Sequence, residues 1–261
     1  MIDLHAHILP GLDDGPVDMD ASLALARIYA QTGFTYVAAT PHAVGMALDF
    51  AGTVRRAVVS INRALRQHAI AVRVLPGMEV GLDPRLAEFV AGGAILPLAN
   101  KNHLLVETPF MRMPLGWQNI VFDLAAGGIT VVFAHPERCL HIMQDNAILN
   151  EMVMLGAKLQ VNWDSFAGAY GREPRHLARR MAEQGLIHCL ATDSHDCVKR
   201  QPGCVTALWA DLTQRVGQAN LRRIALENPV RALRGLAMTD MQAAGALKRP
   251  KRFRWWRWAS A

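Results

Sequence analysis

The chain begins MIDLHAHILPGLDDG, which places two histidines, His5 and His7, shortly before two adjacent aspartates, Asp13 and Asp14. Imidazole nitrogens and carboxylate oxygens together are suitable ligands for borderline divalent metals such as Zn, Mn, Fe and Co. Because residues two apart in an extended strand point to the same side, both histidines can face one site. The opening of the chain therefore predicts a metal centre.

Ligand-type residues recur farther along the chain, where other short apolar segments end. They are His42 in TPH, Glu79 in GMEV, Glu107 in VETPF, His135 in AHPER, and Asp193 and His195 in TDSH. A single histidine at the end of a strand is more often a hydrogen-bonding group than a metal ligand. Such residues at six of seven strand ends are hard to explain in that way, and they exceed what one ion needs. We therefore expect two or three ions bridged by carboxylates.

Seven apolar, β-branched segments would position these residues: IDLHAH, FTYVAATPH, VRVLPGMEV, HLLVETPF, ITVVFAHPER, KLQVNW and HCLATDSH. Helical patterns lie between most of them, and this alternation predicts a parallel sheet. Seven strands without a strong linker favour a closed or nearly closed barrel, in which the carboxyl ends of all strands meet at one mouth. The main rival is an open doubly wound sheet, whose usual G-x-G-x-x-G loop is missing from this sequence.

Composition limits the class of protein. The chain has 261 residues, 51% of them hydrophobic and 19% charged, which is typical of a globular protein rather than a disordered one. No apolar run is long enough for a membrane helix, and no signal peptide is recognisable. The four cysteines show no C-x-x-C spacing, so we expect reduced thiols and a cytoplasmic protein. None is followed six residues later by arginine, which argues against cysteine-based phosphatase chemistry.

The ordered motifs HAH, TPH, GMEV, VETPF, AHPER and TDSH resemble those of the PHP (polymerase and histidinol phosphatase) superfamily. The opening DLHAHILPGLDDG is similar to that of its metal-dependent protein-tyrosine phosphatases, which occur in capsular and exopolysaccharide operons. The resemblance covers about residues 1 to 235, including ENPVRALRG near the end. It implies an α/β fold, a distorted TIM-like (βα)7 barrel over residues 1–236, followed by a tail over 237–261. It also implies three divalent ions, with Mn favoured over Fe, Zn or Co.

The resemblance also implies how the ligands are shared among the three ions. The first ion would be held by His5, His7, Glu79 and Asp193. The second would share Glu79 as a bridge and be completed by Glu107 and His135. The third would be held by His42, His195 and one aspartate of the adjacent pair. Counting from the first histidine favours Asp13, whereas adjacency to Gly15 favours Asp14, and both remain open at this point.

Two arginines are candidate phosphate-binding residues, because a guanidinium donates two parallel hydrogen bonds to phosphate oxygens. Arg138 follows His135 in HPER, and Arg200 matches an arginine in the last motif of the family. The alternative for Arg138 is a surface arginine paired with Glu137. The expected reaction is attack of metal-activated hydroxide on phosphotyrosine, with the arginines neutralising the phosphoryl oxygens. An unligated Asp14, His42 or His195 could donate a proton to the leaving phenolate.

Other functions share parts of this pattern. Histidinol-phosphate phosphatases and other small phosphomonoesterases would use the same metals, so the motifs separate them poorly. An amidohydrolase usually carries a lysine at the fourth strand end, where this chain has Glu107. A non-enzymatic reading is a membrane-tethered binding module. The segment HAVGMALDFAGT departs from the family after the second strand, which affects substrate identity more than chemistry.

The end of the chain, KRPKRFRWWRWASA, combines basic residues with Trp255, Trp256 and Trp258, while the rest of the chain is close to neutral. This composition favours an amphipathic anchor on anionic lipid, which would place the protein peripherally at the inner membrane face. The alternative is a packing or oligomer contact built from Arg–Trp stacking. Nucleic-acid binding is not expected, because the domain shows no basic stripe. The expected partner is a phosphotyrosine protein, for which the family suggests a bacterial tyrosine autokinase.

Overall fold

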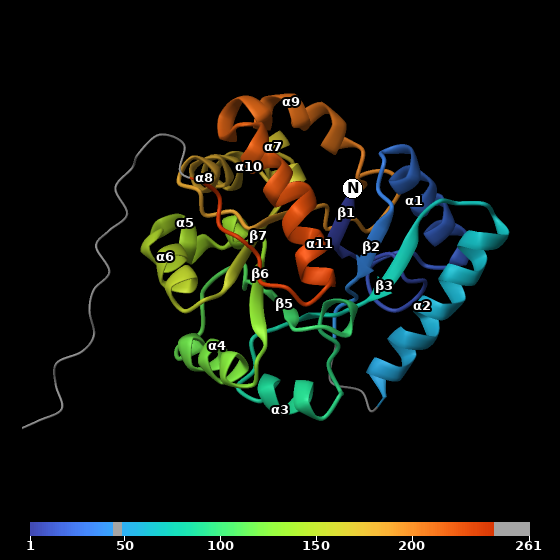
Figure 1. Cartoon of the computed structure of the whole chain (residues 1–261), viewed down its shortest axis with the longest axis horizontal. Coiled ribbons are helices and arrows are strands. Elements are labelled where there is room, and N and C mark those ends of the chain that lie inside the picture. Colours follow the sequence, from blue (N-terminus) through green and yellow to red (C-terminus); the bar gives the residue numbers. More distant parts are fainter. Residues whose placement is uncertain (44–48, 243–261) are drawn as a thin grey trace, which may run out of the picture.

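The structure is a computed structural model, and it describes residues 1–43 and 49–242 of the chain. Paired strands run parallel and form two sheets (Figure 1). The first sheet has the order β1-β2-β3, and the second has the order β4-β5-β6-β7-β8. The expected α/β class and parallel arrangement are confirmed. The basic tail 248–261 and part of the segment 42–53 lie outside the described residues.

The strands are short. They are β1 (Ile2–Ala6), β2 (Tyr36–Ala39), β3 (Arg73–Pro76), β4 (Glu79–Val80), β5 (His103–Glu107), β6 (Thr130–Ala134), β7 (Lys158–Asn162) and β8 (Cys189–Ala191). The α-helices are α1 (Met19–Gln31), α2 (Phe50–Gln67), α3 (Leu86–Ala91), α4 (Trp117–Ala126), α5 (Leu140–Gln144), α6 (Ala147–Met154), α7 (Trp163–Ala167), α8 (Arg172–Glu183), α9 (Cys204–Val216), α10 (Gln218–Arg222) and α11 (Asn228–Leu233). Two short 3-10 turns are η1 (Leu98–Asn100) and η2 (Pro136–Arg138), and a π-helical segment is η3 (Arg223–Glu227).

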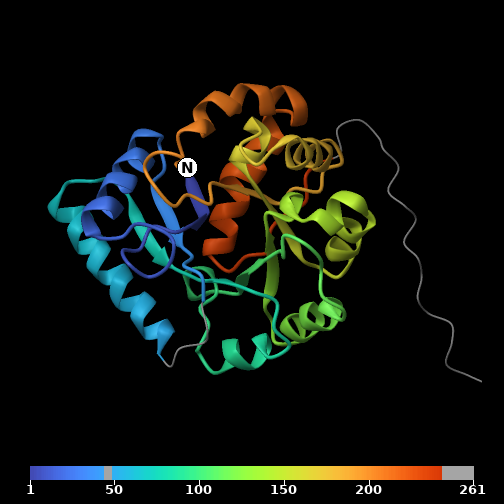
Figure 2. The same ribbon diagram turned by 180° about the vertical axis from the view of Figure 1, so that it is seen from behind.

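Helices surround the sheets, with α1 and α2 beside the first sheet and α4, α6 and α8 beside the second (Figures 1 and 2). Helix α2 buries Val54, Val58, Ile61 and Leu65, whose spacing of three to four residues forms one apolar face. Asp18 caps α1, because its side chain accepts a hydrogen bond from the backbone amide of Ala21. The local signals in the sequence therefore place these helices correctly.

The segment VRVLPGMEV does not form one strand, as the sequence pattern predicts, but two. Strand β3 ends at Pro76 in the first sheet, and β4 begins at Glu79 in the second. The chain crosses between the sheets at Gly77, where a Cβ atom would lie 3.1 Å from the Leu98 side chain. Proline has no backbone amide to continue a ladder, and glycine permits this close approach. The crossing delivers Glu79 to the interface between the two sheets.

Single bridges connect the sheets at both interfaces. Ala6 at the end of β1 pairs with Ser194 after β8, and His42 after β2 pairs with Glu79 of β4. Around the first bridge, the His7 amide donates to the Ser194 carbonyl at 2.9 Å, and the Asp193 amide donates to the His5 carbonyl at 2.9 Å. We call the two bridges, Ala6–Ser194 and His42–Glu79, the seams. The first follows the carboxyl ends of β1 and β8, and the second joins the residues after β2 to Glu79 at the start of β4; the ligand-type residues gather at both.

Strand β1 changes the side to which its residues point. Its register with β2 shifts between Asp3 and Ala6, which marks a β-bulge. Asp3 points outward and accepts a hydrogen bond from the Tyr29 hydroxyl of α1 at 2.7 Å. Strict alternation would point the His5 side chain outward, like that of Asp3. The extra residue of the bulge instead directs His5 inward, where it contacts Gln160 of β7. The bulge therefore places the first histidines between the sheets.

Two apolar cores follow from this arrangement. The larger core lies between the strands and the surrounding helices, and it includes Leu25, Ile61 and Phe133. The smaller core has members from both sheets: Leu4, Ala38, Leu98, Leu105, Val132, Ala134, Cys189, Ala232 and Met238. Because Met238 belongs to this inner cluster, the chain just beyond residue 236 packs against the domain. No helix within the described ranges is long and apolar enough to span a membrane.

His103, at the start of β5, is buried, and neither ring nitrogen has a hydrogen-bond partner among the described residues. Burial and the nearby charge of Lys158 lower its pKa from 6.5 to about 4. Between pH 6.5 and about 4, His103 therefore binds a proton in the unfolded chain but not in the folded chain. Stability should fall as the pH drops from 6.5 to about 4, by roughly 3 kcal/mol for this residue.

The variant His103→Leu should remove this part of the acid destabilisation. Urea unfolding of the chelated protein at several pH values would measure it, with His68→Leu as the control at an exposed histidine. The free energy of unfolding of His103→Leu should decline less steeply between pH 6.5 and 4 than that of the parent chain. Parallel declines would show that His103 is protonated in the folded protein.

Candidate metal centre

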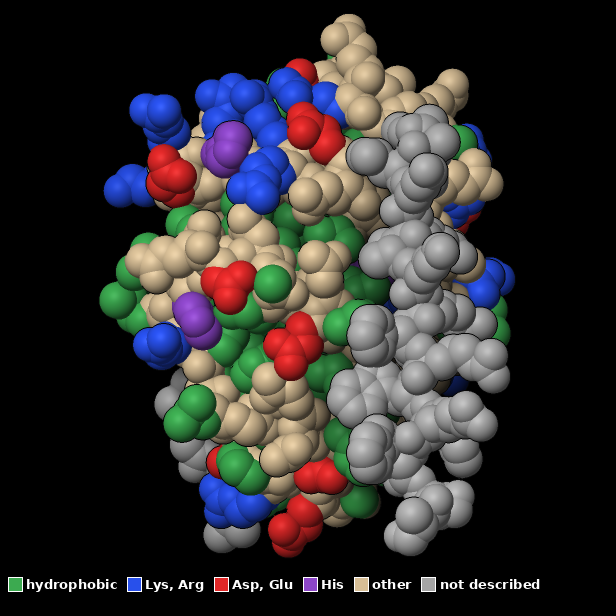
Figure 3. Space-filling model, turned by 90° about the vertical axis from the view of Figure 1, so that its left-hand side faces the viewer, with side chains coloured by type: hydrophobic (Ala, Val, Ile, Leu, Met, Phe, Trp, Pro, Cys, Tyr) green, Lys and Arg blue, Asp and Glu red, His purple; other side chains and the backbone are tan. Residues whose placement is uncertain are grey.

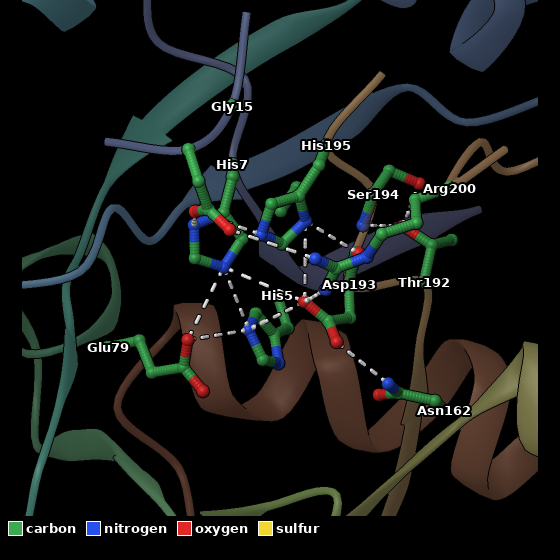
Figure 4. A network of polar contacts seen from close by, with 12 residues as sticks. His5, His7, Gly15, Glu79, Asn162, Thr192, Asp193, Ser194, His195 and Arg200 are labelled. Carbon is green, nitrogen blue, oxygen red and sulfur yellow. Dashed lines mark hydrogen bonds and ion pairs between the residues drawn. The ribbon is translucent and has the colours of Figure 1, made fainter. Parts of the chain in front are cut away.

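Most of the sequence-predicted ligands meet at the seams, and Figure 4 shows five of them: His5, His7, Glu79, Asp193 and His195. His5 lies in β1, and His7 follows it. His42 follows β2, and Glu79 opens β4. The remaining members of the cluster follow β6 and β8; they are His135, Asp193 and His195. Both sheets therefore contribute, and residues far apart in sequence converge because the strands are parallel.

Glu79 is the centre of this cluster and is almost fully buried. Its Oε2 atom lies 3.1 Å from His5 Nε2, 3.3 Å from His7 Nε2 and 3.2 Å from His42 Nδ1. Its Oε1 atom lies 3.2 Å from His135 Nε2. One carboxylate thus faces four imidazoles, three from the first sheet and the residues after its strands, and one, His135, from the second sheet. This is the arrangement that a bridging carboxylate requires.

The donor atoms fall into three groups, within each of which they lie less than 4.8 Å apart. The groups are His7, Asp14, His42 and His195; His5, His7 and Asp193; and His5, Glu79 and His135. Mixed imidazole and carboxylate donors of this kind suit borderline divalent metals. His5 and His7 are shared between groups, so neighbouring ions would lie close together.

Of the adjacent aspartates, Asp14 rather than Asp13 belongs to a donor group. Its Oδ1 lies 3.2 Å from His195 Nε2, and its side chain is 59% exposed at the mouth. The Asp13 carboxylate is occupied instead by the Gly15 and His42 amides, both at 3.0 Å, and by His7 Nδ1 at 2.6 Å. A Cβ at residue 15 would lie 2.5 Å from the His7 carbonyl, so the DDG motif needs its glycine.

Two members of the cluster have strained backbones. His135 has φ 36° and Asp193 has φ 53°, both in the left-handed region that residues other than glycine rarely occupy. Such conformations cost about 1–3 kcal/mol each and persist where the surroundings hold them. Both residues follow the last residues of buried strands, so the strain turns their side chains into the mouth. Strain of this kind is concentrated at functional sites.

The chemistry of these residues fits a divalent metal. Both Glu79 oxygens and His195 Nε2 are buried without a hydrogen-bond partner among the described residues. Burial alone would lower the pKa of His7, but the carboxylates of Asp13 and Glu79 raise it to about 10. Burial alone would raise the pKa of Asp193, but His5, His135 and Arg200 hold it below its ordinary range. Protons and arginines thus supply the positive charge that a cation would supply.

Arg138 and Arg200 both reach Asp193 at the edge of the cluster. Arg138 Nη1 lies 3.0 Å from Asp193 Oδ2, and Arg200 Nη2 lies 2.8 Å from Asp193 Oδ1. The Arg138 guanidinium is packed between the rings of Phe110 and Tyr170, 4.6 and 4.1 Å from their centroids. Glu137 does not pair with Arg138, because its Oε1 accepts hydrogen bonds from the Ser165 hydroxyl of α7 and from the Asn162 backbone amide. Both arginines are therefore oriented at the mouth.

Replacing Arg138 with alanine should leave metal content intact and reduce hydrolysis of a phosphomonoester. A charge-assisted contact to phosphate is worth roughly 1.5–3 kcal/mol, so about a tenfold to hundredfold loss is expected. Arg85→Ala is a matched control, because Arg85 also lies over an aromatic ring and pairs with an aspartate, but away from the cluster. Steady-state kinetics with phosphate as inhibitor would measure both variants. Equal kinetics for the two would assign Arg138 to structure alone.

Glu107, like Asp13, is a predicted ligand that belongs to none of the three donor groups. It ends β5, and its backbone is paired with Ala134, directly before His135. Its position at the same sheet edge is therefore as expected, but its proposed contact with the second ion stays a prediction.

Sequence reasoning missed four residues that complete the surroundings of the cluster. Phe110 and Tyr170 enclose Arg138, and Gln160 and Asn162 of β7 connect His5 to Asp193. The signal for the last two was present: KLQVNW alternates apolar residues with polar ones in a strand that is otherwise buried. Two polar side chains on the inner side of a buried strand indicate partners inside the molecule.

The fold and this cluster define a class of α/β proteins with a polynuclear metal-type site at the carboxyl ends of parallel strands. The family model described as "Capsular polysaccharide synthesis, CpsB/CapC" matches residues 1–234. The chain therefore belongs to the CpsB/CapC family, and the resemblance identified from its sequence motifs is confirmed.

Individual relatives agree with this membership. The chain is 33% identical to the tyrosine-protein phosphatase YwqE of Bacillus subtilis over 210 residues, covering 80% of this chain and 83% of that protein. It is 25% identical to the tyrosine-protein phosphatase CpsB of Streptococcus pneumoniae, covering 88% and 96%. A crystal structure reported for these two proteins as metal-dependent tyrosine phosphatases superimposes with a TM-score of 0.88, 31% identity and coverage of 95% and 100%. A histidinol phosphate phosphatase from Lactococcus lactis shares the fold alone, with a TM-score of 0.51, 12% identity and coverage of 82% and 94%.

Proposed function

We propose that the chain is a metal-dependent phosphomonoesterase that hydrolyses phosphotyrosine in proteins. The observation that carries this proposal is the placement of two arginines, Arg138 and Arg200, on a carboxylate that also belongs to a metal-type donor group. A site of this composition attracts a dianionic group and holds it beside the cations. The family membership supports the same conclusion.

The three donor groups correspond to three divalent ions, of which Mn is the favoured metal. We assign Asp14 to the group of His42 and His195, and we assign Asp13 to orienting His7 and the loop, in place of the catalytic role first considered for Asp14. Glu79 would bridge two ions, and Glu107 would complete one of them. When bound, such ions activate water and neutralise phosphoryl charge.

The residues of the chain itself would perform the remaining tasks. Arg138 and Arg200 would bind the equatorial phosphoryl oxygens, whose charge grows in the transition state. Phe110, which is 45% exposed and stacks on His135 at 5.6 Å, offers an aromatic face beside the phosphoryl site. An aromatic ring of the substrate, such as the phenyl ring of phosphotyrosine, can pack on the exposed part of Phe110. The leaving phenolate has a pKa near 10 and needs less acid assistance than an alkoxide.

The finer description of the fold is also a proposal. Together, the two sheets and their seams support one distorted barrel that is closed at the mouth by single bridges rather than by full ladders. The crossing at Gly77 and the bulge in β1 would be the distortions. In this description residues 1–236 form the barrel domain and 237–261 form the tail.

The proposed partner is a bacterial tyrosine autokinase of polysaccharide biosynthesis, met in the cytoplasm at the inner membrane face. Basic charge near the start of the tail supports this location. Helix α8, at the upper left of Figure 1, carries Arg172, Arg175, Arg179 and Arg180, and Lys and Arg side chains gather at the upper end of the face in Figure 3. Met241 packs beside Gly185, just after α8. The tail would therefore extend a surface that is already basic.

Hydrolysis of a phosphotyrosine peptide beside histidinol phosphate, with chelator and with added Mn²⁺, tests the proposed reaction. We expect Mn²⁺-dependent turnover of the peptide and a lower kcat/KM for histidinol phosphate. The opposite preference would assign the chain to small-molecule metabolism, and absence of turnover on either substrate with full metal content would favour a binding module.

Deleting residues 249–261 should leave hydrolysis of p-nitrophenyl phosphate nearly unchanged, because the three donor groups are formed by side chains between His5 and His195. Binding to vesicles with anionic lipid should fall, and binding of the full chain should weaken with salt because lipid attraction is screened. Neutral vesicles are the control. If the full chain ignores anionic vesicles at low salt, the tail has no membrane role. A change in oligomeric state on deletion would identify a subunit contact instead.

A further inference from the structure

Strand β7 supplies no ligand-type residue, yet two of its side chains lie beside the metal-type cluster. Gln160 and Asn162 are fully buried and two residues apart, so both point inward. Gln160 Oε1 lies 2.9 Å from His5 Nδ1, and Gln160 Nε2 lies 2.7 Å from Asn162 Oδ1. Asn162 Nδ2 lies 2.9 Å from Asp193 Oδ2, a contact visible in Figure 4. Two amides therefore connect His5 to Asp193.

The direction of each hydrogen bond in the series His5–Gln160–Asn162–Asp193 follows from the Asp193 carboxylate at its end. An ionised carboxylate can only accept, so Asn162 must donate to Asp193 through its nitrogen. The carbonyl oxygen of Asn162 then faces Gln160, which must donate through its own nitrogen. The Gln160 oxygen is left to face His5, so His5 Nδ1 must carry a proton. Each step leaves one orientation, because reversing any amide would set two acceptors or two donors against each other.

We propose that Gln160 and Asn162 are positioning residues that hold His5 with its Nε2 atom directed at the metal. The proposal rests on the proposed metal-dependent function. A histidine that ligates through one nitrogen commonly donates its other N–H to an oxygen, which fixes the ring and the tautomer. His5 Nε2 is the atom that faces Glu79 and Asp193, at 3.1 and 3.4 Å. The amide chain thus presents the correct nitrogen to two of the three donor groups.

The same pair of amides also fixes the position of the Asp193 carboxylate. Asn162 donates to Asp193 Oδ2, whereas Oδ1 faces the histidines. Arg138 shares Oδ2 at 3.0 Å, but a phosphoryl group would compete for that arginine. Asn162 would then be the partner that keeps the carboxylate in place while Arg138 binds substrate. The Asp193 carboxylate, which follows β8 of the second sheet, therefore sets the tautomer of His5 in β1 of the first sheet.

The experiment measures Mn²⁺ binding by competition with a chelator, in Gln160→Met, in Asn162→Ala and in the double variant. Loss of such supporting hydrogen bonds typically costs about tenfold to a hundredfold in metal affinity. Each single variant should show a loss of this size for the ions that use His5. Because the two amides act as one unit, the double variant should bind about as weakly as the weaker single variant. Gln160→Glu, which keeps an acceptor for His5 Nδ1, should recover part of the affinity lost in Gln160→Met.

Ser165→Ala is the matched control, because it also removes a buried hydrogen bond near the end of β7, from Ser165 Oγ to Glu137 Oε1 at 2.7 Å. It should reduce the thermal stability of the metal-free protein without changing Mn²⁺ affinity. Affinities within twofold of the parent chain in both single variants would overturn the proposal, and so would fully additive losses. If the parent chain itself binds no Mn²⁺, the metal-dependent function fails first, whatever the variants do.

Discussion

Replacing Glu79 with alanine should abolish phosphatase activity and reduce the number of metal ions held per chain. The Glu79 carboxylate faces His5, His7, His42 and His135 at 3.1 to 3.3 Å, more imidazoles than any other residue of the cluster meets. Without it these rings lose the negative charge that a pair of neighbouring cations needs between them. Divalent ions supply several kcal/mol of transition-state stabilisation, so the loss should reach at least about a thousandfold.

Metal analysis and kinetics on the same preparation would test this expectation. Glu173→Ala is a suitable control, because Glu173 is an exposed glutamate on α8, remote from the cluster. Circular dichroism would show whether the Glu79 variant retains its fold. An active variant with the full metal content would remove Glu79 from its bridging position and leave the three groups as independent sites.

Removal of divalent metal by a chelator should stop hydrolysis completely, whereas alkylation of the thiols should leave it nearly unchanged. None of the three donor groups contains a cysteine. Cys139 and Cys189 are buried, and burial raises the pKa of the Cys139, Cys189, Cys197 and Cys204 thiols, which keeps them protonated and unreactive. The reaction therefore has no thiolate available as a nucleophile.

The comparison uses one preparation treated with chelator, with iodoacetamide or with neither. Adding Mn²⁺ back to the chelated sample should restore turnover, which separates metal loss from unfolding. Mass spectrometry would establish which thiols were modified. Loss of activity with iodoacetamide, combined with full activity in chelator, would favour a cysteine nucleophile and refute the metal-dependent reaction.

Much of the cluster could be predicted from the sequence because parallel strands place their carboxyl ends together. A ligand-type residue such as His42 or His135 needs only a correct strand end to be placed at the mouth. Spacing of two residues correctly paired His5 with His7, although the bulge, not simple alternation, turns both inward. The role of Arg138 and Arg200 was predicted with the help of the family resemblance, because both lie in segments after strands that carry no periodic pattern.

Other features could not be predicted from the sequence, because they depend on contacts between distant residues. The choice between Asp13 and Asp14 depends on the His42 amide, which reaches Asp13 across the mouth. The break in VRVLPGMEV depends on which sheet each half joins, and strand propensity is the same on both sides of the break. Gln160 and Asn162 read as ordinary polar positions until His5 and Asp193 are placed beside them. The expected effect of the segment 42–53 on substrate identity and the expected membrane role of the basic tail stay predictions, because residues 44–48 and 243–261 lie outside the described residues.

The seam between β1 and the segment after β8 has a consequence for how the protein acquires its metal. Ala6 meets Ser194 there, and two of the donor groups need residues 193 or 195 as well as residues 5 or 7. During synthesis His5 and His7 are made long before Asp193 and His195. A flexible histidine-rich N-terminus would favour copper, following the general affinity order of divalent metals. Because two groups close only when the ends of the fold meet, they can present their fixed geometry to a metal only after residues 5 to 195 have folded.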